Sequence, residues 1–276
     1  MSLLGAAEIR ELAAQLDLRP AKSLGQNFVH DGNVCRKIVR TADVIESDIA
    51  LEIGPGLGSL TLALLEVARE VIAVEIDSRL AQQLPLTVAQ HSDRSDALQV
   101  HNLDALQLQS LEKDPTVLVA NLPYNVSVPV LLHLLETLPS LQRGVVMVQA
   151  EVADRLAAKP HSKEYGVPSV KAAWWADVTG AGSVSRTIFW PQPNVDSKLV
   201  AFTRRTPPGD EAMRKKVFMV IDLAFAQRRK MLRAALSSLF GSSAAAESAL
   251  QSVGIDPTLR GEALDIQDFC TIAKCV

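Results

Sequence analysis

The chain has 276 residues, 48% of them hydrophobic, which is enough for one large folded unit and a small one and excludes a disordered protein. The formal net charge of −3 gives no sign of a nucleic-acid-binding protein when taken over the whole chain. The start of the chain lacks a secretory signal pattern, and the uncharged stretch 115–132 contains prolines and asparagines. Neither feature suits a secreted or membrane protein. We therefore expect a soluble cytoplasmic protein whose three cysteines, Cys35, Cys270 and Cys275, are reduced.

The first part of the chain alternates between helix and strand patterns. Helices are predicted over 6–18, where Ile9, Leu12 and Leu16 share one side, and over about 33–42. Short apolar strands and helices then follow one another, with strands expected at 49–53, 71–74, 98–100, 116–119 and 144–149, and helices at 59–68, 77–84 and 128–138. This alternation predicts an α/β fold: a Rossmann-like parallel sheet with helices on both faces.

The pattern changes beyond Trp174. Segments 176–185 and 199–204 are predicted to be antiparallel strands that close the sheet, and Thr206–Asp210 forms a turn-rich break. Beyond the break the apolar spacing is helical; Gly254 is expected to end one helix and Asp256-Pro257 to start the next. We place a boundary near Pro207, which predicts a catalytic domain over 1–206 and a small all-helical domain over 207–276.

A glycine-rich turn follows the strand at 49–53. Its glycines are Gly54, Gly56 and Gly58, and position 59 is Ser, so the spacing is G-x-G-x-G and not the G-x-G-x-x-G of dinucleotide-binding proteins. Glycines allow the backbone to bend sharply and a ligand to approach closely. This spacing is typical of S-adenosylmethionine enzymes and disfavours a nicotinamide oxidoreductase. An ordinary structural turn is the alternative interpretation.

Two acidic residues lie where a nucleoside could be held. Glu75 ends the second strand about 20 residues after the first glycine, where a carboxylate can accept hydrogen bonds from both hydroxyls of a ribose. Asp104 follows the third strand and could accept a hydrogen bond from an adenine amine. Each could instead be an ordinary strand-end residue, but the glycine turn at the correct distance favours cofactor binding by Glu75.

The tetrapeptide Asn121-Leu122-Pro123-Tyr124 follows the fourth strand, at the sheet edge where chemistry occurs in open α/β folds. An adenine amine is a poor nucleophile because its lone pair is delocalised into the ring. The side-chain oxygen of Asn121 and the carbonyl of Leu122 could accept its two N–H bonds and localise that lone pair. Pro123 stiffens the turn, and Tyr124 offers a face on which a flipped-out base can stack. A plain proline turn is the alternative.

At this point the sequence resembles the ribosomal RNA adenine N6-dimethyltransferases, and within them the small-subunit enzymes most closely. The resemblance runs from about Lys22 to the C-terminus. Six segments in the family's order contribute to it: Lys22–Phe28, Glu52–Gly58, Asn121–Ser127, Val148–Leu156, Phe189–Ser197 and Gln227–Lys230. Asn102 and Leu103 depart from the family, which often has Gly directly before the aspartate.

The resemblance implies roles at individual positions. Asn27 and the backbone at Val29 would lie along the cofactor with Gly54 and Gly56, while Glu75 would hold the ribose and Asp104 the adenine. Asn121, Leu122, Pro123 and Tyr124 would present the target amine, and Phe189 would stack on the other side of the base. The implied cofactor is S-adenosylmethionine, with S-adenosylhomocysteine as product and no metal. The implied substrate is 16S rRNA in the small ribosomal subunit, methylated by a monomer at two adjacent adenosines.

Basic residues outnumber acidic ones between Arg204 and Arg233, although the whole chain is acidic. The run Arg228-Arg229-Lys230 favours a phosphate-binding surface, because clustered cations displace counterions from nucleic acid. We therefore expect the helical domain over 207–276 to bind RNA and the ribosome. A solvated helix face is the alternative. At the level of the whole protein, two alternatives remain: a large-subunit rRNA methyltransferase of the macrolide-resistance type, and a methyltransferase-like assembly factor.

Overall fold

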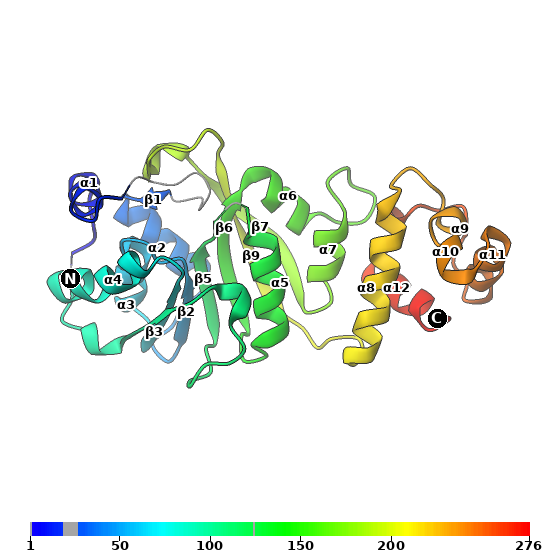
Figure 1. Ribbon diagram of the computed structural model, residues 1–276, viewed down its shortest axis with the longest axis horizontal. Coiled ribbons are helices and arrows are strands. Elements are labelled where there is room, and N and C mark those ends of the chain that lie inside the picture. The colour runs from blue at the N-terminus through cyan, green and yellow to red at the C-terminus, as the bar shows by residue number, and fades with distance from the viewer. Residues whose placement is uncertain (1, 19–26, 124) are drawn as a thin grey trace. The chain divides into compact units, whose positions relative to one another are not determined.

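The computed structural model describes residues 2–18, 27–123 and 125–276, and its chain divides into two compact units (Figure 1). The first unit contains 1–153 and 179–204, and the second contains 154–178 and 205–276. The second unit therefore includes a segment, 154–178, that precedes the predicted boundary near Pro207. The division into a catalytic and an RNA-binding domain stays a prediction.

The elements of the first unit follow the alternation predicted from the sequence. The helices are α1 (Ala6–Gln15), α2 (Gly32–Thr41), α3 (Ser59–Leu65), α4 (Ser78–His91), α5 (Ser127–Thr137) and α6 (Ala150–Ala157, which continues into the second unit). The strands are β1 (Phe28–Val29), β2 (Ile49–Ile53), β3 (Glu70–Glu75), β4 (Leu98–Asn102), β5 (Val117–Asn121), β6 (Arg143–Gln149), β7 (Ala176–Val184), β8 (Phe189–Trp190) and β9 (Ser197–Arg204). Short 3-10 helices are η2 (Ser95–Ala97), η3 (Ala105–Gln107) and η4 (Arg186–Ile188).

Seven strands form the main sheet in the order β4-β3-β2-β5-β6-β9-β7. The pairs from β4 to β6 are parallel, and β9 pairs antiparallel with β6. The Rossmann-like parallel sheet is therefore confirmed, with β9 as an antiparallel closing strand and β7 beside it at the edge. Alternate residues such as Val71 and Ala73 join one hydrophobic cluster with α2 and α3, and the intervening Ile72 and Val74 face the other side because side chains alternate along a strand. Helices consequently cover both faces of the sheet, whose central strands β3, β2, β5 and β6 are buried, whereas the edge strands β4 and β7 are partly exposed.

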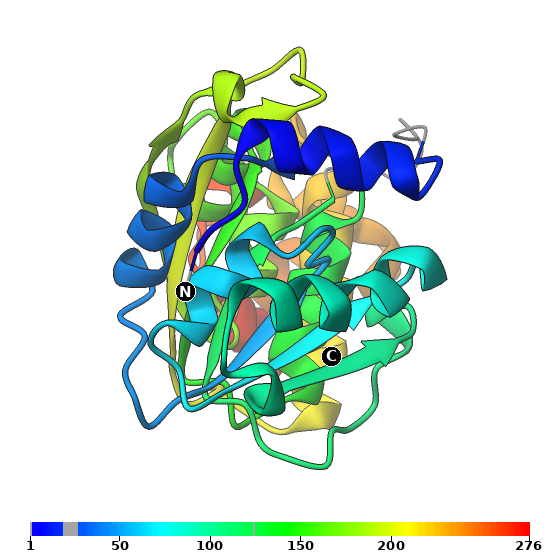
Figure 2. The ribbon, with the colours of Figure 1, turned by 90° about the vertical axis from the view of Figure 1, so that its left-hand side faces the viewer.

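A two-stranded ladder of β1 and β8 lies outside the main sheet. Phe28 pairs with Trp190 and Val29 with Phe189. The N-terminal helix α1 contacts β8, and Figure 2 shows it lying across the unit beside the segment that contains this strand. Two-residue strands have no detectable period, so the sequence pattern did not predict this ladder.

The second unit is mainly helical, as expected for the C-terminal part of the chain. Its helices are α7 (Val167–Ala172), α8 (Glu211–Ala226), α9 (Leu232–Ala235), α10 (Ser237–Phe240), α11 (Ser243–Ser252), η5 (Gly261–Ala263) and α12 (Ile266–Ala273). Gly254 follows α11 with a φ of 77°, which agrees with the predicted helix end. The predicted helix start at Asp256-Pro257 is wrong: the Asp256 carboxylate accepts from Thr258 N and closes a turn, and Asp265 is the residue that caps α12.

Three further observations bear on sequence-based expectations. Cys35, Cys270 and Cys275 are free. In the described ranges, no helix is long and apolar enough to span a membrane. Among the same residues, no group of three His, Cys, Asp or Glu side chains is arranged to hold a metal ion.

Candidate active site

The chain turns from β2 into α3 through the predicted glycine loop. Gly54, Gly56 and Gly58 have φ angles of 68°, 59° and 104°, a region in which any residue with a Cβ atom is strained. A Cβ atom at Gly56 would lie 3.0 Å from the ring of Phe28. The loop therefore needs glycine for its backbone conformation, and at Gly56 also for the close approach of an aromatic ring.

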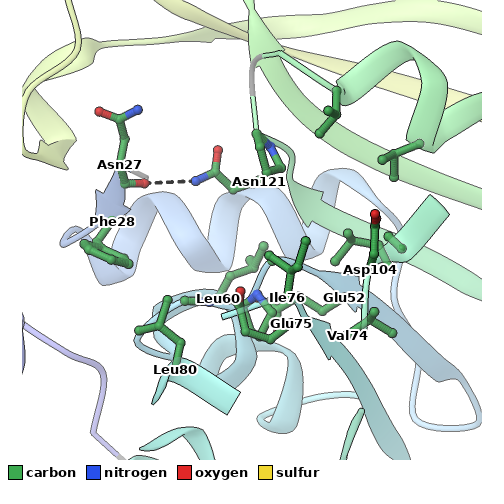
Figure 3. Close-up of a pocket in the computed structure, with 18 of the residues that line it drawn as sticks. Asn27, Phe28, Glu52, Leu60, Val74, Glu75, Ile76, Leu80, Asp104 and Asn121 are labelled. Atoms are coloured by element: carbon green, nitrogen blue, oxygen red, sulfur yellow. Dashed lines mark hydrogen bonds between the residues drawn. The ribbon is translucent and has the colours of Figure 1, made fainter. Parts of the chain in front are cut away.

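This loop borders a pocket at the C-terminal ends of β2, β3 and β5 (Figure 3). The pocket contains about 1150 Å³ of space, part of it open to solvent. The residues predicted from the sequence that line it are Asn27, Val29, Gly54, Gly56, Glu75, Asp104, Asn121 and Pro123. The structure thus brings together every described residue that was predicted to bind the cofactor.

Glu75, at the end of β3, places a carboxylate in the wall of the pocket although its side chain is only 5% exposed. Its Oε2 atom accepts a hydrogen bond from Gly56 N at 3.1 Å, and its Oε1 atom accepts one from Asp77 N at 3.0 Å. Burial raises the pKa of Glu75, and these backbone N–H groups act against that rise. The backbone holds the carboxylate in a fixed position between the glycine loop and the start of α4.

Two exposed apolar side chains flank the next part of the pocket. Ile76 and Leu106 line it and are 57% and 38% exposed. Between them in the chain, Asp104 Oδ1 accepts from Leu106 N at 2.9 Å and starts η3. The sequence analysis missed Ile76 and Leu106. Their positions in the sequence were the available signal: Ile76 directly follows Glu75, and Leu106 is two residues after Asp104. Apolar side chains beside such polar ligands can contact the faces of a flat ring.

Asn102, which departs from the family pattern, has a structural role beside Asp104. Its side-chain nitrogen donates to the carbonyl oxygens of Glu75 and Ile76 at 2.8 and 3.2 Å. These two hydrogen bonds join the end of β4 to the loop that follows β3.

The turn after β5 is held from two directions. Asn121 Nδ2 donates to the carbonyl oxygen of Asn27 at 3.1 Å, and Leu122 N donates to Met147 O at 3.1 Å. Because a carbonyl can only accept, the amide oxygen of Asn121 must face away from Asn27, as Figure 3 shows. The Leu122 side chain is buried outside the pocket, so only its backbone could reach a substrate. Tyr124 lies outside the described residues, as do residues 22–26 of the first family segment.

Phe189, which was predicted to stack on the target base, does not line the pocket either. Its side chain is 2% exposed and belongs to the hydrophobic cluster under β8. Its neighbour Trp190 is partly buried and stacks on Phe28, with ring centroids 6.4 Å apart and an interplanar angle of 20°. The predicted stacking of Phe189 on a target base stays a prediction.

Comparison with known proteins decides between families that share this fold. The sequence model of the family described as "Ribosomal RNA adenine dimethylase" matches residues 18–276.

The chain belongs to the ribosomal RNA adenine dimethylase family.

Relatives of this dimethylase cover its whole length. Proteins named "Ribosomal RNA small subunit methyltransferase A" from Thermobifida fusca and Corynebacterium diphtheriae are 61% and 59% identical to it, over 99% of this chain and 96% and 95% of theirs. A dimethyladenosine transferase from Plasmodium falciparum has a similar fold, with a TM-score of 0.75 at 24% identity over 89% of this chain and 95% of that one. As a dimethylase of this family, the protein is an S-adenosylmethionine-dependent methyltransferase.

The pocket of the dimethylase fits that cofactor in its chemistry. A buried carboxylate at Glu75 suits the two hydroxyls of a ribose, and the apolar side chains of Ile76 and Leu106 suit the faces of an adenine ring. The glycine loop forms part of the wall of the same pocket. The donor and acceptor set of the pocket and its apolar walls are those of a nucleoside site.

A second buried acid, Glu52, lies in the same pocket and was not assigned a role from the sequence. It is in β2, and its Oε2 atom accepts a hydrogen bond from Thr61 Oγ1 at 2.6 Å. Burial raises the pKa of Glu52 to about 8, against the effect of the Thr61 hydroxyl, and nearby Glu75 adds to the rise. The Glu52 side chain is therefore largely protonated at neutral pH and adds little negative charge beside Glu75.

The predicted RNA-binding residues lie in the second unit, in the turn after α8 and not on a helix. Arg228 forms an ion pair with Glu262 at 3.0 Å and donates to Lys163 O at 2.5 Å. Arg229 and Lys230 are exposed. These contacts give Arg228 a structural role within its own unit. Arg229 and Lys230 are therefore better candidates than Arg228 for contacts with RNA phosphates.

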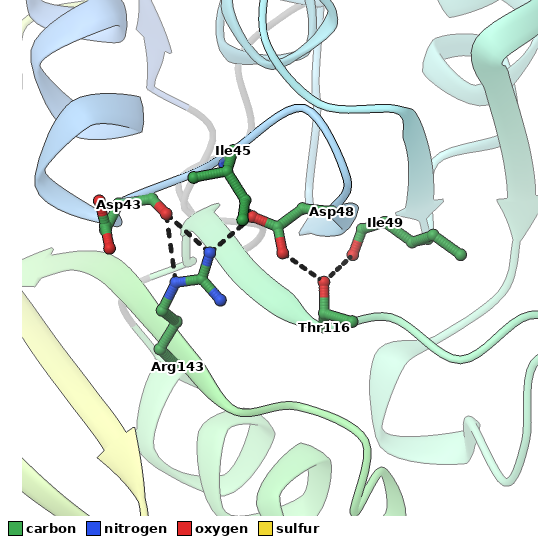
Figure 4. A network of polar contacts seen from close by, with 6 residues as sticks. All are labelled: Asp43, Ile45, Asp48, Ile49, Thr116 and Arg143. Carbon is green, nitrogen blue, oxygen red and sulfur yellow. Dashed lines mark hydrogen bonds and ion pairs between the residues drawn. The ribbon is translucent and has the colours of Figure 1, made fainter.

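A polar network lies at the other end of the sheet from the pocket (Figure 4). The buried Asp48 carboxylate accepts from Arg143 at 2.6 Å, from Thr116 Oγ1 at 2.6 Å and from Ile45 N at 2.8 Å. The Arg143 guanidinium also donates to Asp43 O at 2.7 Å. This network joins the starts of β2, β5 and β6, and the far ends of β2 and β5 border the pocket.

Proposed function

We propose that this dimethylase transfers methyl groups from S-adenosylmethionine to the N6 amines of two adjacent adenosines in the 3′-terminal hairpin of small-subunit rRNA, during ribosome biogenesis. The names of relatives at 58–61% identity support the small subunit as substrate. The observation with most weight is the position of Asn121 at the same pocket as Glu75. An acceptor for the target amine and an anchor for the cofactor then share one space.

The cofactor would be held by residues of three strand ends. Glu75 would accept hydrogen bonds from the ribose hydroxyls, and the second oxygen of Asp104, Oδ2, would accept one from the adenine amine. Ile76 and Leu106 would contact the two faces of the adenine ring. Asn27, Val29, Gly54 and Gly56 would lie along the methionine part. When bound, S-adenosylmethionine supplies an electrophilic methyl group.

The target amine would be prepared by the turn after β5. The Asn121 side-chain oxygen faces away from Asn27, and the Leu122 carbonyl lies beside it in the same turn. Two acceptors on the two N–H bonds of the amine would draw it towards tetrahedral geometry and localise its lone pair. They would also stabilise the positive charge that develops on the nitrogen as it is methylated. Pro123 limits the backbone motion of this turn, and Tyr124 and Phe189 are the proposed stacking partners of the base.

The second unit would supply RNA affinity without touching the reacting atoms. Arg229 and Lys230, and to a smaller extent Arg228, would contact phosphates of the subunit, since phosphate contacts position a nucleic acid and add affinity. We propose that the protein acts in the cytoplasm as a monomer.

The direct test is transfer of labelled methyl groups to isolated ribosomal subunits. The protein and labelled cofactor are incubated with small subunits that lack the modification, and in parallel with large subunits, and the modified nucleotides are mapped. We expect two adjacent dimethyladenosines near the 3′ end of the small-subunit RNA and none in the large subunit. Labelling of large-subunit adenine would favour the macrolide-resistance type of enzyme, and binding without transfer would favour an assembly factor.

A further inference from the structure

Segment 27–30 contacts the proposed cofactor site at three points. Asn27 O accepts from the Asn121 side chain at 3.1 Å, and Val29 O accepts from Ser59 Oγ, at the start of α3, at 2.5 Å. Between them, the Phe28 ring lies on the glycine loop, so close that a Cβ atom at Gly56 would be only 3.0 Å from it and would force the ring to shift. Movement of this segment would therefore disturb the catalytic turn, the glycine loop and the start of α3 together.

On its other side, segment 27–30 is held by the chain before and within β8. His30 N donates to Ile188 O at 2.9 Å, and β1 pairs with β8 over two residues only. So short a ladder gives little stability by itself. The Trp190 side chain adds a further contact, because its indole stacks on the ring of Phe28.

The two aromatic rings and the glycine loop therefore form a stack of three layers. Trp190 packs on Phe28, and Phe28 packs on Gly56. Trp190 is not among the residues that line the pocket, whereas Phe28 is. Any effect of Trp190 on a ligand in the pocket must then pass through Phe28.

We propose that Trp190 is a positioning residue for the cofactor: by stacking on Phe28 it keeps segment 27–30 against the glycine loop and so maintains the wall of the cofactor pocket. The inference rests on the proposed function, because it takes the ligand of this pocket to be S-adenosylmethionine. It assigns to Trp190 an effect on cofactor affinity, and no part in the methyl transfer itself.

The experiment compares Trp190→Ala, Trp190→Phe and Val88→Ala with the wild type, all at a temperature where each is folded. Val88 is a buried residue of α4, outside segment 27–30 and β8, and serves as a control for lost stability in the same hydrophobic cluster. Calorimetry measures the Kd for S-adenosylhomocysteine, and steady-state kinetics separate KM for the cofactor from kcat. For Trp190→Ala we expect a Kd and a KM about fivefold higher or more, the size expected for a lost aromatic stack. At saturation kcat should stay within about twofold of the wild type, because bound cofactor contacts segment 27–30 and holds it, with the Asn27–Asn121 bond, in place. Trp190→Phe should restore most of the affinity, and Val88→Ala should bind as the wild type does.

A second comparison tests whether Trp190 acts through Phe28. If it does, Trp190→Ala should change the Kd little in a Phe28→Leu background, because residues that act as a unit are not additive. Wild-type affinity in Trp190→Ala, or an equal loss of affinity in Val88→Ala, would overturn the proposal and leave the proposed function intact. Failure of the wild type itself to bind S-adenosylhomocysteine would overturn both.

Discussion

The side-chain nitrogen of Asn121 lies 3.1 Å from the carbonyl oxygen of Asn27 and donates a hydrogen bond to it. This contact fixes which way the amide faces before any substrate is present, so the amide oxygen is already directed away from Asn27. Preorganised polar groups of this kind lower a barrier because they need not reorient during the reaction. The orientation of Asn121 is thus set by a residue 94 positions earlier in the chain.

For this reason we predict that Asn121→Ala folds and binds cofactor but transfers few methyl groups. Loss of one preorganised polar contact to the reacting group typically lowers kcat by about 100-fold or more. Single-turnover methylation of small subunits measures the rate, and calorimetry measures cofactor affinity, which should change by less than the rate. Near-normal turnover would rule out amine activation by Asn121.

A second prediction concerns Glu75. Glu75→Ala removes the acceptor proposed for two ribose hydroxyls, and hydrogen bonds to charged groups contribute roughly 1.5–3 kcal/mol each. We expect cofactor affinity to fall at least about tenfold in calorimetry. Glu70→Gln is the matched control, because Glu70 begins the same strand but pairs with Lys113 at the surface. If Glu75→Ala binds as tightly as this control, the ribose lies elsewhere.

The buried carboxyl of Glu52 should make stability depend on pH. Its pKa is raised from the ordinary value of 4.5 to about 8 in the folded protein, so the folded state holds a proton that the unfolded chain releases. The stabilising contribution of Glu52 is then fully present below about pH 4.5 and is lost as the pH rises towards and through 8. We expect the Tm of Glu52→Gln to fall less than that of the wild type between pH 6 and pH 9. Parallel curves for the two proteins would contradict a protonated Glu52.

The network around Asp48 should matter for stability and not for binding. Asp48→Asn removes the charge that faces Arg143 and should lower the free energy of unfolding by about 3 kcal/mol. This value is at the lower end of the range for breaking a buried ion pair, because Arg143 is partly exposed. Urea denaturation measures this change. In Asp43→Asn the backbone carbonyl that Arg143 contacts is kept, so that variant should stay close to the wild type. Cofactor affinity of folded Asp48→Asn should be unchanged, because the network is at the far end of the strands.

The turn after α8 allows a separation of RNA contacts from structural ones. Arg229→Gln and Lys230→Gln should each weaken binding to the small subunit and reduce the logarithmic salt slope by about 0.7–0.9. Arg228→Gln should instead lower the Tm, because it breaks the contacts with Glu262 and Lys163. Salt titrations and melting curves on the three variants check this assignment. Unchanged slopes for both Arg229→Gln and Lys230→Gln would mean that RNA binds elsewhere.

Much of the first unit could be predicted from the sequence because its strands and helices have strong periodic patterns. The strand at 49–53 was predicted to the residue, and the glycine loop, Glu75, Asp104 and Asn121 all lie at one pocket. The helix predicted over 77–84 in fact continues to His91 as α4. Pro85 lies inside this helix; Thr87 and Val88 extend its buried face beyond the proline, and this packing outweighs the lost hydrogen bond.

Features that depend on contacts between distant segments could not be predicted. The pairing of β1 with β8 joins residues about 160 positions apart through two-residue strands, which have no pattern of their own. Burial of Phe189 follows from that pairing and from the cluster beneath it. Segment 154–178 joins the second unit through contacts such as that of Tyr165 Oη with Leu264 O at 2.8 Å. Local composition contains no information about any of these partners.

The position of β9 in the sheet has a consequence for the order in which the protein can mature on the ribosome. Strand β6 lies between β5 and β9, and its apolar run Val145–Val148 is buried in the complete protein. While the emerging chain is shorter than about 204 residues, β9 is missing, and one side of β6 has unpaired backbone groups. Such an apolar strand edge is prone to pair with other chains. The central strands β2 to β6 are therefore synthesised before β9. Strand β6 gains its second neighbour only after segment 154–178, which belongs to the second unit, has also been synthesised.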